Sequence, residues 1–581
     1  MRIIFTISIL LFSTTLLLSQ NNKLITFFEK SNYLETPRYD STIAFCKALA
    51  KSSPLIHYSS FGVSPEGREL PLLIADKDHI SDVSLLKNSG RTILFIQACI
   101  HAGEPDGKDA GFMLFRDFVT DKNITKYLEN VSVVFIPIFN VDGHERWSAY
   151  NRINQNGPTE MGWRTNANNL NLNRDYIKAE APETKAWIGL FNKLDPDFFI
   201  DCHVTDGADY IYPITYGIEI NGNMDSNITK WQRNIYLPEI TSSMEKANYP
   251  IFHYVSFREW HNIESGLESW VTAPMLSNGY TAMVNCPGLL IESHMLKDYK
   301  TRVFATYKML EYTLQILNNT GKELKKYKKE ADLYSSSDEF RKKPFPLEFN
   351  FTKDSTMVEF KGMEYTQEKS DLTGGKWFKF GKTIKNYKLP YFNNIKPITF
   401  ADLPKYYVVP KQWAFIEDLL IIHNIKYTKT KNDTAINVKT YIFNNVQFGA
   451  TPYEGRQRVS SFEIDTTTIK MELAKGSILV PVNQAKSRLI AHIFEPMSDA
   501  SLLKFGYFNT IFEQKEYGES YVLEPLAREM LKDPKIKEAY ETEVKNNSNY
   551  PKDPDAILNW FYSHSQYKDI QQNIYPIGKI F

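Results

Sequence analysis

The stretch TILFIQACIHAGE, residues 92–104, decides the fold of this chain. Its first part, Thr92–Ile96, is an uninterrupted apolar run, which is typical of a strand that is buried on both faces of a sheet. His101 and Glu104 follow where that strand runs out, so an imidazole and a carboxylate are offered together at its end. Zinc binds both kinds of side chain, and a catalytic zinc site uses three protein ligands and leaves one position open. A third ligand is therefore expected elsewhere in the chain.

A second apolar run, FFIDCH over residues 198–203, also ends in a histidine. Because ligands collect at the carboxyl edge of parallel strands, two such strand ends predict a metal site built on an α/β sheet, with His203 as the third ligand. Cys99 and Cys202 lie beside these residues and are either soft metal ligands or small buried residues. Side chains alternate along a strand, so Cys202 should point away from His203, which favours the second interpretation.

A third apolar segment, LLIE over residues 289–292, ends in Glu292. A hydrolytic metal site also needs a base, and a cation or donor for the oxyanion. Glu292 is the predicted base, because a buried carboxylate without a role would be costly. Arg164 and Arg174 lie on a long connection between strands, where they either grip a carboxylate or form structural ion pairs. His294 either lines the site or forms hydrogen bonds behind it.

One further pair of potential ligands competes with the first. His261 and Glu264 have the same spacing as His101 and Glu104. No strand-like run precedes them, and their surroundings are polar and aromatic. We therefore interpret the second pair as surface or cleft-lining residues.

The composition of the whole chain excludes some classes of protein. With 68 basic and 68 acidic residues in 581, the formal net charge is zero, which argues against a general nucleic-acid binder. The four cysteines are few and widely spaced, so the chain is not a disulfide scaffold.

The first twenty residues read as a signal peptide. Arg2 provides the charged start, Ile3–Leu18 is apolar, and Ser19-Gln20 offers a small residue for cleavage. An uncleaved membrane anchor is the alternative, because the run is only slightly shorter than a spanning helix. The favoured prediction is an exported protein, periplasmic or extracellular, with no stable membrane span after cleavage.

Strands and helices alternate over residues 21–320, which predicts a mixed, largely parallel sheet flanked by helices. The helix that includes Val303–Leu317 is expected to stop at Asn318–Gly321, and residues 321–344 read as a linker. Residues 345–581 are then a separate accessory domain of unknown role, mainly β with a helical end.

The first half of the chain resembles the zinc carboxypeptidases, the metallocarboxypeptidase family M14, over about residues 35–317. The resemblance rests on six motifs in the order of the family. These are His101-x-x-Glu104, Asn140-x-Asp142-Gly143, Trp163-Arg164, Leu172-Asn173-Arg174, His203 and Leu290-Ile291-Glu292-Ser293-His294.

The resemblance implies an exopeptidase that acts on the C-termini of peptides or proteins. It implies one Zn²⁺ ion, water activation by a general base, a cation for the oxyanion, and binding of the substrate's terminal carboxylate. The residues implied are His101, Glu104 and His203 for the metal, Glu292 for the base, Arg164 for the oxyanion, Asn173 and Arg174 for the carboxylate, and Tyr280 as a substrate-covering tyrosine.

Two departures from the pancreatic-type relatives limit what the resemblance implies about substrate. Gly103 stands where those enzymes have an arginine, and the connection from Arg164 to Asn173 is shorter. Two other functions stay open beside the carboxypeptidase: a zinc amidase that acts on cell-wall peptides, and a non-catalytic peptide-binding protein on the same fold. The intact set of ligands and base speaks against the non-catalytic protein.

Overall fold

The computed structural model describes residues 24–254, 256–546 and 553–581. The predicted signal segment lies outside these residues. Among the described residues, no helix combines the length and the apolarity that are needed to cross a membrane.

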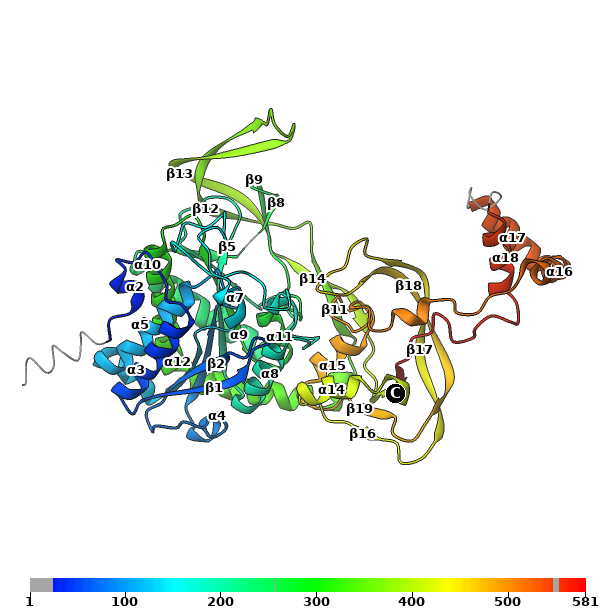
Figure 1. Ribbon diagram of the computed structural model, residues 1–581, viewed down its shortest axis with the longest axis horizontal. Helices are drawn as coiled ribbons and strands as arrows, with labels where there is room; N and C mark the ends of the chain where they lie inside the picture. Colours follow the sequence, from blue (N-terminus) through cyan, green and yellow to red (C-terminus); the bar gives the residue numbers. More distant parts are fainter. Residues whose placement is uncertain (1–23, 255, 547–552) are drawn as a thin grey trace, which may run out of the picture.

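An eight-stranded sheet forms the centre of the molecule, in the order β1-β2-β4-β3-β5-β10-β6-β7 (Figure 1). Its inner strands β4, β3, β5 and β10 are parallel to one another, whereas β2 and β6 are antiparallel to their inner neighbours. The strands span Ile56–Val63 (β1), Glu69–Ala75 (β2), Thr92–Ala98 (β3), Val131–Ile136 (β4), Phe198–Thr205 (β5), Ile214–Ile218 (β6), Ile251–His253 (β7) and Gly288–His294 (β10). This arrangement confirms the predicted mixed, largely parallel sheet.

The apolar runs form the inner strands because both of their faces are covered by helices. Every residue of β3 and of β5 is buried. On one face, Phe95 of β3 stacks on Trp187 of α8 (Pro182–Leu194), with ring centroids 5.7 Å apart. The opposite face is covered by α5 (Asp106–Thr120) and α12 (Tyr299–Ser335). The other helices include α2 (Phe27–Lys30), α3 (Tyr39–Ser52), α4 (Val83–Leu86), α6 (Lys122–Thr125), α7 (Val141–Glu145), α9 (Ser226–Trp231), α10 (Leu237–Lys246), α11 (Ser277–Met283) and α13 (Asp338–Arg341).

The predicted end of the closing helix at Asn318–Gly321 is wrong, and so is the linker at 321–344. Helix α12 continues to Ser335. Gly321 lies inside it against β3, where a Cβ atom would come within 2.1 Å of the Thr92 hydroxyl oxygen. This glycine therefore permits close packing of helix on sheet and does not end the helix, because the tertiary contact outweighs its low helix propensity.

A second sheet joins two parts of the chain that are distant in sequence. Along the chain, β8 (Ser256–Glu259) and β9 (Asn262–Glu268) follow β7 and precede β10. They pair with each other, and β9 also pairs with β13 of a hairpin from the second half. That hairpin, β12 (Thr356–Lys369) and β13 (Lys376–Phe392), extends away from the central sheet (Figure 1).

The C-terminal region is mainly β with a helical end, as predicted. A six-stranded sheet has the order β16-β19-β15-β20-β17-β18, and β11 pairs with β14. Helices α16, α17 and α18 lie apart from it (Figure 1). The strands are β11 (Phe345–Phe351), β14 (Ile395–Ala401), β15 (Tyr406–Val409), β16 (Thr428–Lys429), β17 (Thr434–Phe448), β18 (Val459–Leu473), β19 (Ile478–Pro481) and β20 (Gly578–Ile580), and the helices are α14 (Ile416–Ile422), α15 (Ser487–Phe494), α16 (Ser520–Met530), α17 (Pro534–Asn546) and α18 (Pro554–Ser563).

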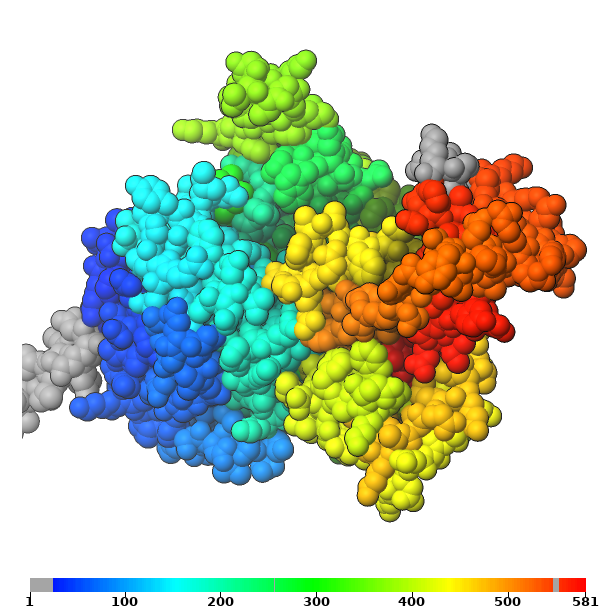
Figure 2. Space-filling model, turned by 45° about the vertical axis from the view of Figure 1, so that its right-hand side comes forward, coloured from blue at the N-terminus to red at the C-terminus, as the bar shows by residue number. Residues whose placement is uncertain are grey.

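The two halves of the chain share one continuous apolar core. The Ser487 hydroxyl of α15 donates to the Ser335 carbonyl at the end of α12, with an oxygen–oxygen distance of 2.6 Å. In the space-filling view, the C-terminal region lies directly against the first half (Figure 2). The division of roles between residues 21–320 and 345–581 stays a prediction.

Candidate metal centre

The three predicted ligands meet at the carboxyl edge of the inner strands. The Nδ1 atoms of His101 and His203 lie 3.2 Å apart, and Glu104 Oε2 lies 3.1 Å from the Nδ1 atom of His203 and 3.3 Å from that of His101. All three residues are buried. Tetrahedral zinc with bonds of about 2.1 Å places neighbouring ligand atoms about 3.4 Å apart. The spacing and chemistry of these donors therefore fit a zinc ion, and within the described residues they form the one such cluster of His, Cys, Asp or Glu side chains.

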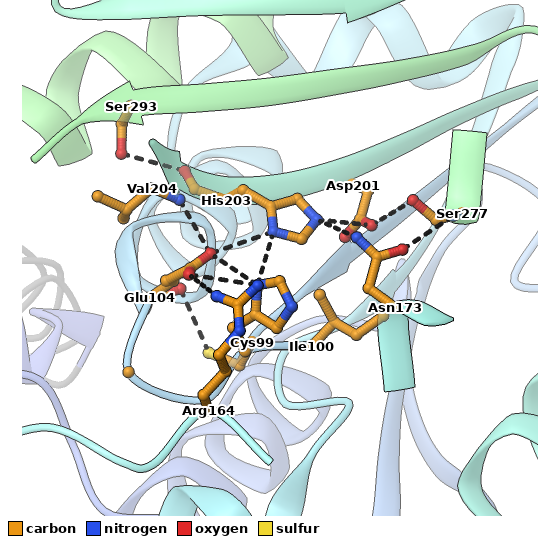
Figure 3. A network of polar contacts seen from close by, with 12 residues as sticks. Cys99, Ile100, Glu104, Arg164, Asn173, Asp201, His203, Val204, Ser277 and Ser293 are labelled. Atoms are coloured by element: carbon orange, nitrogen blue, oxygen red, sulfur yellow. Dashed lines mark hydrogen bonds and ion pairs between the residues drawn. The ribbon is translucent and has the colours of Figure 1, made fainter. Parts of the chain in front are cut away.

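The other ring nitrogen of each histidine is also held. His203 Nε2 lies 2.8 Å from Asp201 Oδ2 (Figure 3), and His101 Nε2 lies 3.0 Å from Asn171 Oδ1. Both partners are oxygen acceptors, so each ring can donate from Nε2, which leaves Nδ1 as the nitrogen available to a cation. Such outer contacts orient metal-binding imidazoles.

Two of the three ligands have pKa values that suit the binding of a cation, whereas Asp201 and Glu104 raise the pKa of His203 against the effect of burial, so a cation would displace a proton from this ring. Burial lowers the pKa of His101 to about 4, so this ring is neutral at pH 7. Burial alone would raise the pKa of Glu104, but His101 and Arg152 lower it well below its usual value. Glu104 is therefore an ionised carboxylate.

Glu292 lies directly beside His203 in the sheet. The two residues are register partners in the parallel pair β10–β5. Burial raises the pKa of Glu292 to about 8, and His203 offsets part of that shift. A carboxyl group with a raised pKa at the edge of a cavity has the properties of a general base or acid.

Two arginines contact the Oε1 atom of Glu104, which also lies 3.2 Å from His101 Nδ1. Arg164 Nη1 lies 3.4 Å from Glu104 Oε1, and its side chain is 41% exposed, so it also faces solvent. Its loop is held by Asn140, whose Nδ2 donates to the Arg164 carbonyl at 3.2 Å. The second arginine is Arg152, which sequence reasoning missed, with Nη2 at 3.0 Å from the same carboxylate oxygen.

Asn173 and Arg174 lie in the short turn Leu172–Arg174 beside His203. The Asn173 side-chain oxygen is already engaged, since Oδ1 accepts from the Ser277 backbone N–H at 2.9 Å, while Nδ2 lies 3.4 Å from His203 Nε2 (Figure 3). Both residues line the adjoining cavity. Because its guanidinium is charged and can form a bidentate pair, Arg174 is the better suited of the two to meet a substrate carboxylate.

The structure does not bring Tyr280 to the site, so its predicted contact with substrate is wrong. Tyr280 is fully buried in α11, and its hydroxyl is hydrogen-bonded to His423 Nδ1 at 3.0 Å. Tyr254 lines the cavity instead, in the connection between β7 and β8. Burial, followed by the charge of Glu292, raises the pKa of the Tyr254 hydroxyl, so it stays protonated and can donate a hydrogen bond.

The remaining candidates lie outside the ligand cluster. His261 stands in the β8–β9 turn, and Glu264 pairs with Lys385 at 2.9 Å, as expected of surface residues. His294 is buried against Asp209, with Nε2 at 3.1 Å from Oδ1. The cysteines Cys46, Cys99, Cys202 and Cys286 are all buried and unbridged.

A cavity of about 1410 Å³ opens beside the ligand cluster. Its lining includes Glu292 and Tyr254 at the metal end, and Gly217, Asn278 and Leu290 beyond them. Residues of the second half, Tyr391 and Asn393 among them, also line it. A smaller cavity of about 240 Å³ lies beside Arg152 and Asp206.

Comparison with known proteins agrees with this centre. Residues 42–305 match the family model described as zinc carboxypeptidase. The inactive metallocarboxypeptidase ECM14 of Saccharomyces cerevisiae is 27% identical over 208 residues, which cover 31% of this chain and 47% of the yeast protein. The chain thus spans about half the length of this curated relative.

Among solved structures, a putative carboxypeptidase A from Shewanella denitrificans OS-217 is 17% identical, with 50% of this chain and 69% of that chain covered and a TM-score of 0.37. A metallo-carboxypeptidase from Pseudomonas aeruginosa in complex with (2-guanidinoethylmercapto)succinic acid has the same identity and TM-score, with 50% and 70% covered. The segment that matches the family model carries His101, Glu104, His203 and Glu292, so residues 42–305 form a domain of the zinc carboxypeptidase family.

Proposed function

We propose that this protein is a zinc-dependent carboxypeptidase that hydrolyses the last peptide bond of peptides with a free C-terminus. The observation that carries the proposal is the convergence of His101 Nδ1, His203 Nδ1 and the Glu104 carboxylate, with Glu292 beside them on the next strand. A binding protein without activity would need no base at that position.

In the proposed mechanism, His101, Glu104 and His203 hold the zinc ion. Zinc bound there would polarise the scissile carbonyl and make a water molecule more acidic. Glu292 would take a proton from the attacking water and return it to the leaving amine. The Arg164 guanidinium would donate to the oxygen on which negative charge develops. Arg174 would pair with the terminal carboxylate of the substrate, and the Tyr254 hydroxyl would hydrogen-bond to the bound peptide.

The lining of the large cavity supports an uncharged last residue in the substrate. Gly217, Asn278 and Leu290 offer no charge beyond the metal end. Outside the metal centre and residues 164–174, the described lining carries three acidic or basic side chains: Arg233 and Glu245, which are exposed, and His253, which is neutral at pH 7 because burial lowers its pKa to about 4. A buried opposite charge would be needed to select basic or acidic side chains.

The test is metal analysis of the purified full chain, followed by hydrolysis of peptides with free or amidated C-termini. We expect one zinc ion per chain, release of the last residue from free C-termini, and little hydrolysis of the amidated peptides. Equal rates on amidated peptides, or a protein purified without chelators that contains no zinc, would contradict the proposal.

The variant Glu292→Gln separates the base from the ligands. We expect it to keep its zinc and to lose at least about 100-fold in kcat, which is the usual scale of general base catalysis. Asp209→Asn, at the buried His294 contact, is the matched carboxylate control and should keep its activity. Unchanged turnover in Glu292→Gln would show that the base is wrongly assigned.

The alternative function is a zinc amidase that acts on cell-wall peptides. In the same test, zinc in the protein without release of the last residue from free C-termini would favour this alternative. Export to the periplasm or the exterior is part of the proposal and rests on the sequence of residues 1–20 alone. N-terminal sequencing of the protein recovered outside the cytoplasm tests it.

A further inference from the structure

A turn from the C-terminal region reaches the metal centre. The strands β17 and β18 are joined by a connection that contains Tyr453, Glu454, Gly455 and Arg456. Glu454 Oε2 accepts a hydrogen bond from the Asn171 backbone N–H at 2.9 Å, across 283 positions of sequence. Figure 2 shows this yellow part of the chain lying against the cyan part of the first half. The contact therefore ties the two halves together beside the site.

Asn171 is the residue through which this contact reaches the ligands. Its side-chain oxygen meets His101 Nε2 at 3.0 Å and accepts from the Asn173 backbone N–H at 3.0 Å. Asn173 in turn lies against His203. The turn Leu172–Arg174, which begins at Asn171, thus touches both imidazoles of the cluster, and Glu454 holds its first residue.

A second contact from the β17–β18 connection supports the C-terminal end of the Leu172–Arg174 turn. Arg456 Nε donates to Glu180 Oε1 at 2.7 Å. The Glu180 backbone N–H donates to Asp175, at the end of the Leu172–Arg174 turn, at 3.0 Å. The Arg456 guanidinium also lies 3.7 Å from the ring centroid of Tyr507. Glu454 and Arg456 therefore approach the turn from its two ends.

The backbone conformation of the Tyr453–Arg456 turn does not favour glutamate at position 454. Tyr453 and Arg456 exchange both backbone hydrogen bonds, at 2.9 and 3.1 Å, and the central residues Glu454 and Gly455 have φ of 49° and 75°. Two positive φ values define a type I′ turn, which prefers Asn or Asp followed by Gly. Glutamate is unfavourable in this conformation. Its longer side chain reaches Asn171, which offers a reason for its presence.

We propose that Glu454 is a positioning residue for the metal centre: it fixes the Asn171 turn and, through Asn171, the ring of His101. The C-terminal region then helps to build the site and is more than an attached support. This inference rests on the proposed zinc site, and outer contacts of this kind change metal affinity by about 10- to 100-fold in known sites.

The test compares the parent with full-length variants of Glu454 whose new residue adopts the turn conformation at least as easily as glutamate does. Glycine and asparagine tolerate the positive φ at position 454 better than glutamate does, but their side chains cannot reach Asn171. Glu454→Gln keeps an acceptor oxygen on a side chain of the same length. Asn445→Gly is the matched control, because Asn445 also has a positive φ of 50°, at the irregularity in the β17–β18 pairing, and its side chain bonds within the hairpin, to Glu463.

Zinc affinity is measured by titrating Zn²⁺ into the metal-depleted protein against a chromophoric chelator, and Tm is measured without metal. We expect Glu454→Gly and Glu454→Asn to bind zinc about tenfold more weakly with Tm unchanged or raised, while Glu454→Gln and Asn445→Gly behave like the parent. Turnover should fall in kcat more than it changes in KM.

Two results would overturn the inference. One is a Glu454→Gly protein with parental zinc affinity and parental kcat, which would make Glu454 an ordinary turn residue. The other is loss of affinity only in proportion to loss of Tm, in Glu454→Asn as well, which would make its role general stability. If the parent binds zinc but releases no residue from peptides, the proposed function fails while the affinity comparison still decides the role of Glu454.

Discussion

The side chain of Arg152 lies across Gly103, in front of the ligand Glu104. A Cβ atom on Gly103 would come within 2.9 Å of Arg152 Cγ and 2.8 Å of the Gly162 carbonyl oxygen. Arg152 also pairs with Glu104 at 3.0 Å. The absence of a side chain at Gly103, which departs from the pancreatic-type pattern, therefore leaves room for an arginine that comes from a different loop.

We expect Gly103→Ala to lower kcat/KM, because the added methyl group must displace Arg152 or the Gly162 backbone. Overpacking of this kind costs about 1–3 kcal/mol of unfolding free energy. Gly189→Ala is the control, since no atom lies within 4 Å of its added Cβ in helix α8 and alanine should stabilise that helix by about 0.5–1 kcal/mol. Denaturant unfolding and peptide kinetics measure both effects. Equal behaviour of the two variants would refute the role given to Gly103.

We expect Asp201→Asn to weaken zinc binding by about 10- to 100-fold, because the carboxylate that holds His203 Nε2 at 2.8 Å is lost. The Ser277 hydroxyl, which donates to the same oxygen at 2.5 Å, would also lose its charged acceptor. Asp209→Asn removes a similar His–Asp contact, at His294, away from the ligands. Chelator competition should separate the two variants. The same zinc affinity in both would argue against an orienting role for Asp201.

Two tyrosine variants should differ in kind. Tyr254→Phe is expected to lower kcat/KM about fivefold, the scale of one net hydrogen bond of about 1 kcal/mol, with the zinc content unchanged. Tyr280→Phe leaves the buried His423 Nδ1 without its partner and should cost about 1–3 kcal/mol in unfolding free energy with KM unchanged. Steady-state kinetics and urea unfolding test the pair. A rise in KM for Tyr280→Phe alone would restore the first assignment.

The stability of the metal-free protein should depend on pH through Glu183. Burial raises the pKa of this carboxyl to about 7, with Asn166 donating to it at 3.3 Å. The folded state thus holds a proton that the unfolded state releases above about pH 4.5, so the folded state loses stability as pH rises from about 4.5 to about 7. The loss reaches up to about 3 kcal/mol.

The variant Glu183→Gln removes that dependence. It should melt at a higher temperature than the parent at pH 8, and at the same temperature near pH 4. Comparing the two proteins at each pH cancels the contributions of all other groups. A difference in Tm that is the same at both pH values would show that Glu183 does not carry the proton.

The sequence alone predicts the ligands because their signal is local. Each of His101, His203 and Glu292 ends an apolar run, and parallel strands bring such ends together. Tyr254 and Arg152 lie in irregular connections without periodicity, so nothing in their neighbourhood marks them. Other residues escape prediction because their partners are distant in sequence. Gly321 reads as a helix stop until β3 is packed against it, and Glu454 gains meaning only when its turn meets Asn171.

The match to the family model stops at residue 305, which lies within helix α12. The same helix continues to Ser335, and the cavity next to the ligands takes part of its wall from Tyr391 and Asn393. The family match therefore ends before the helix and the cavity wall that complete the structure around the site. A protein cut at residue 305 would expose the apolar side of the sheet beneath the lost turns of α12, and the two halves should unfold together in one cooperative transition.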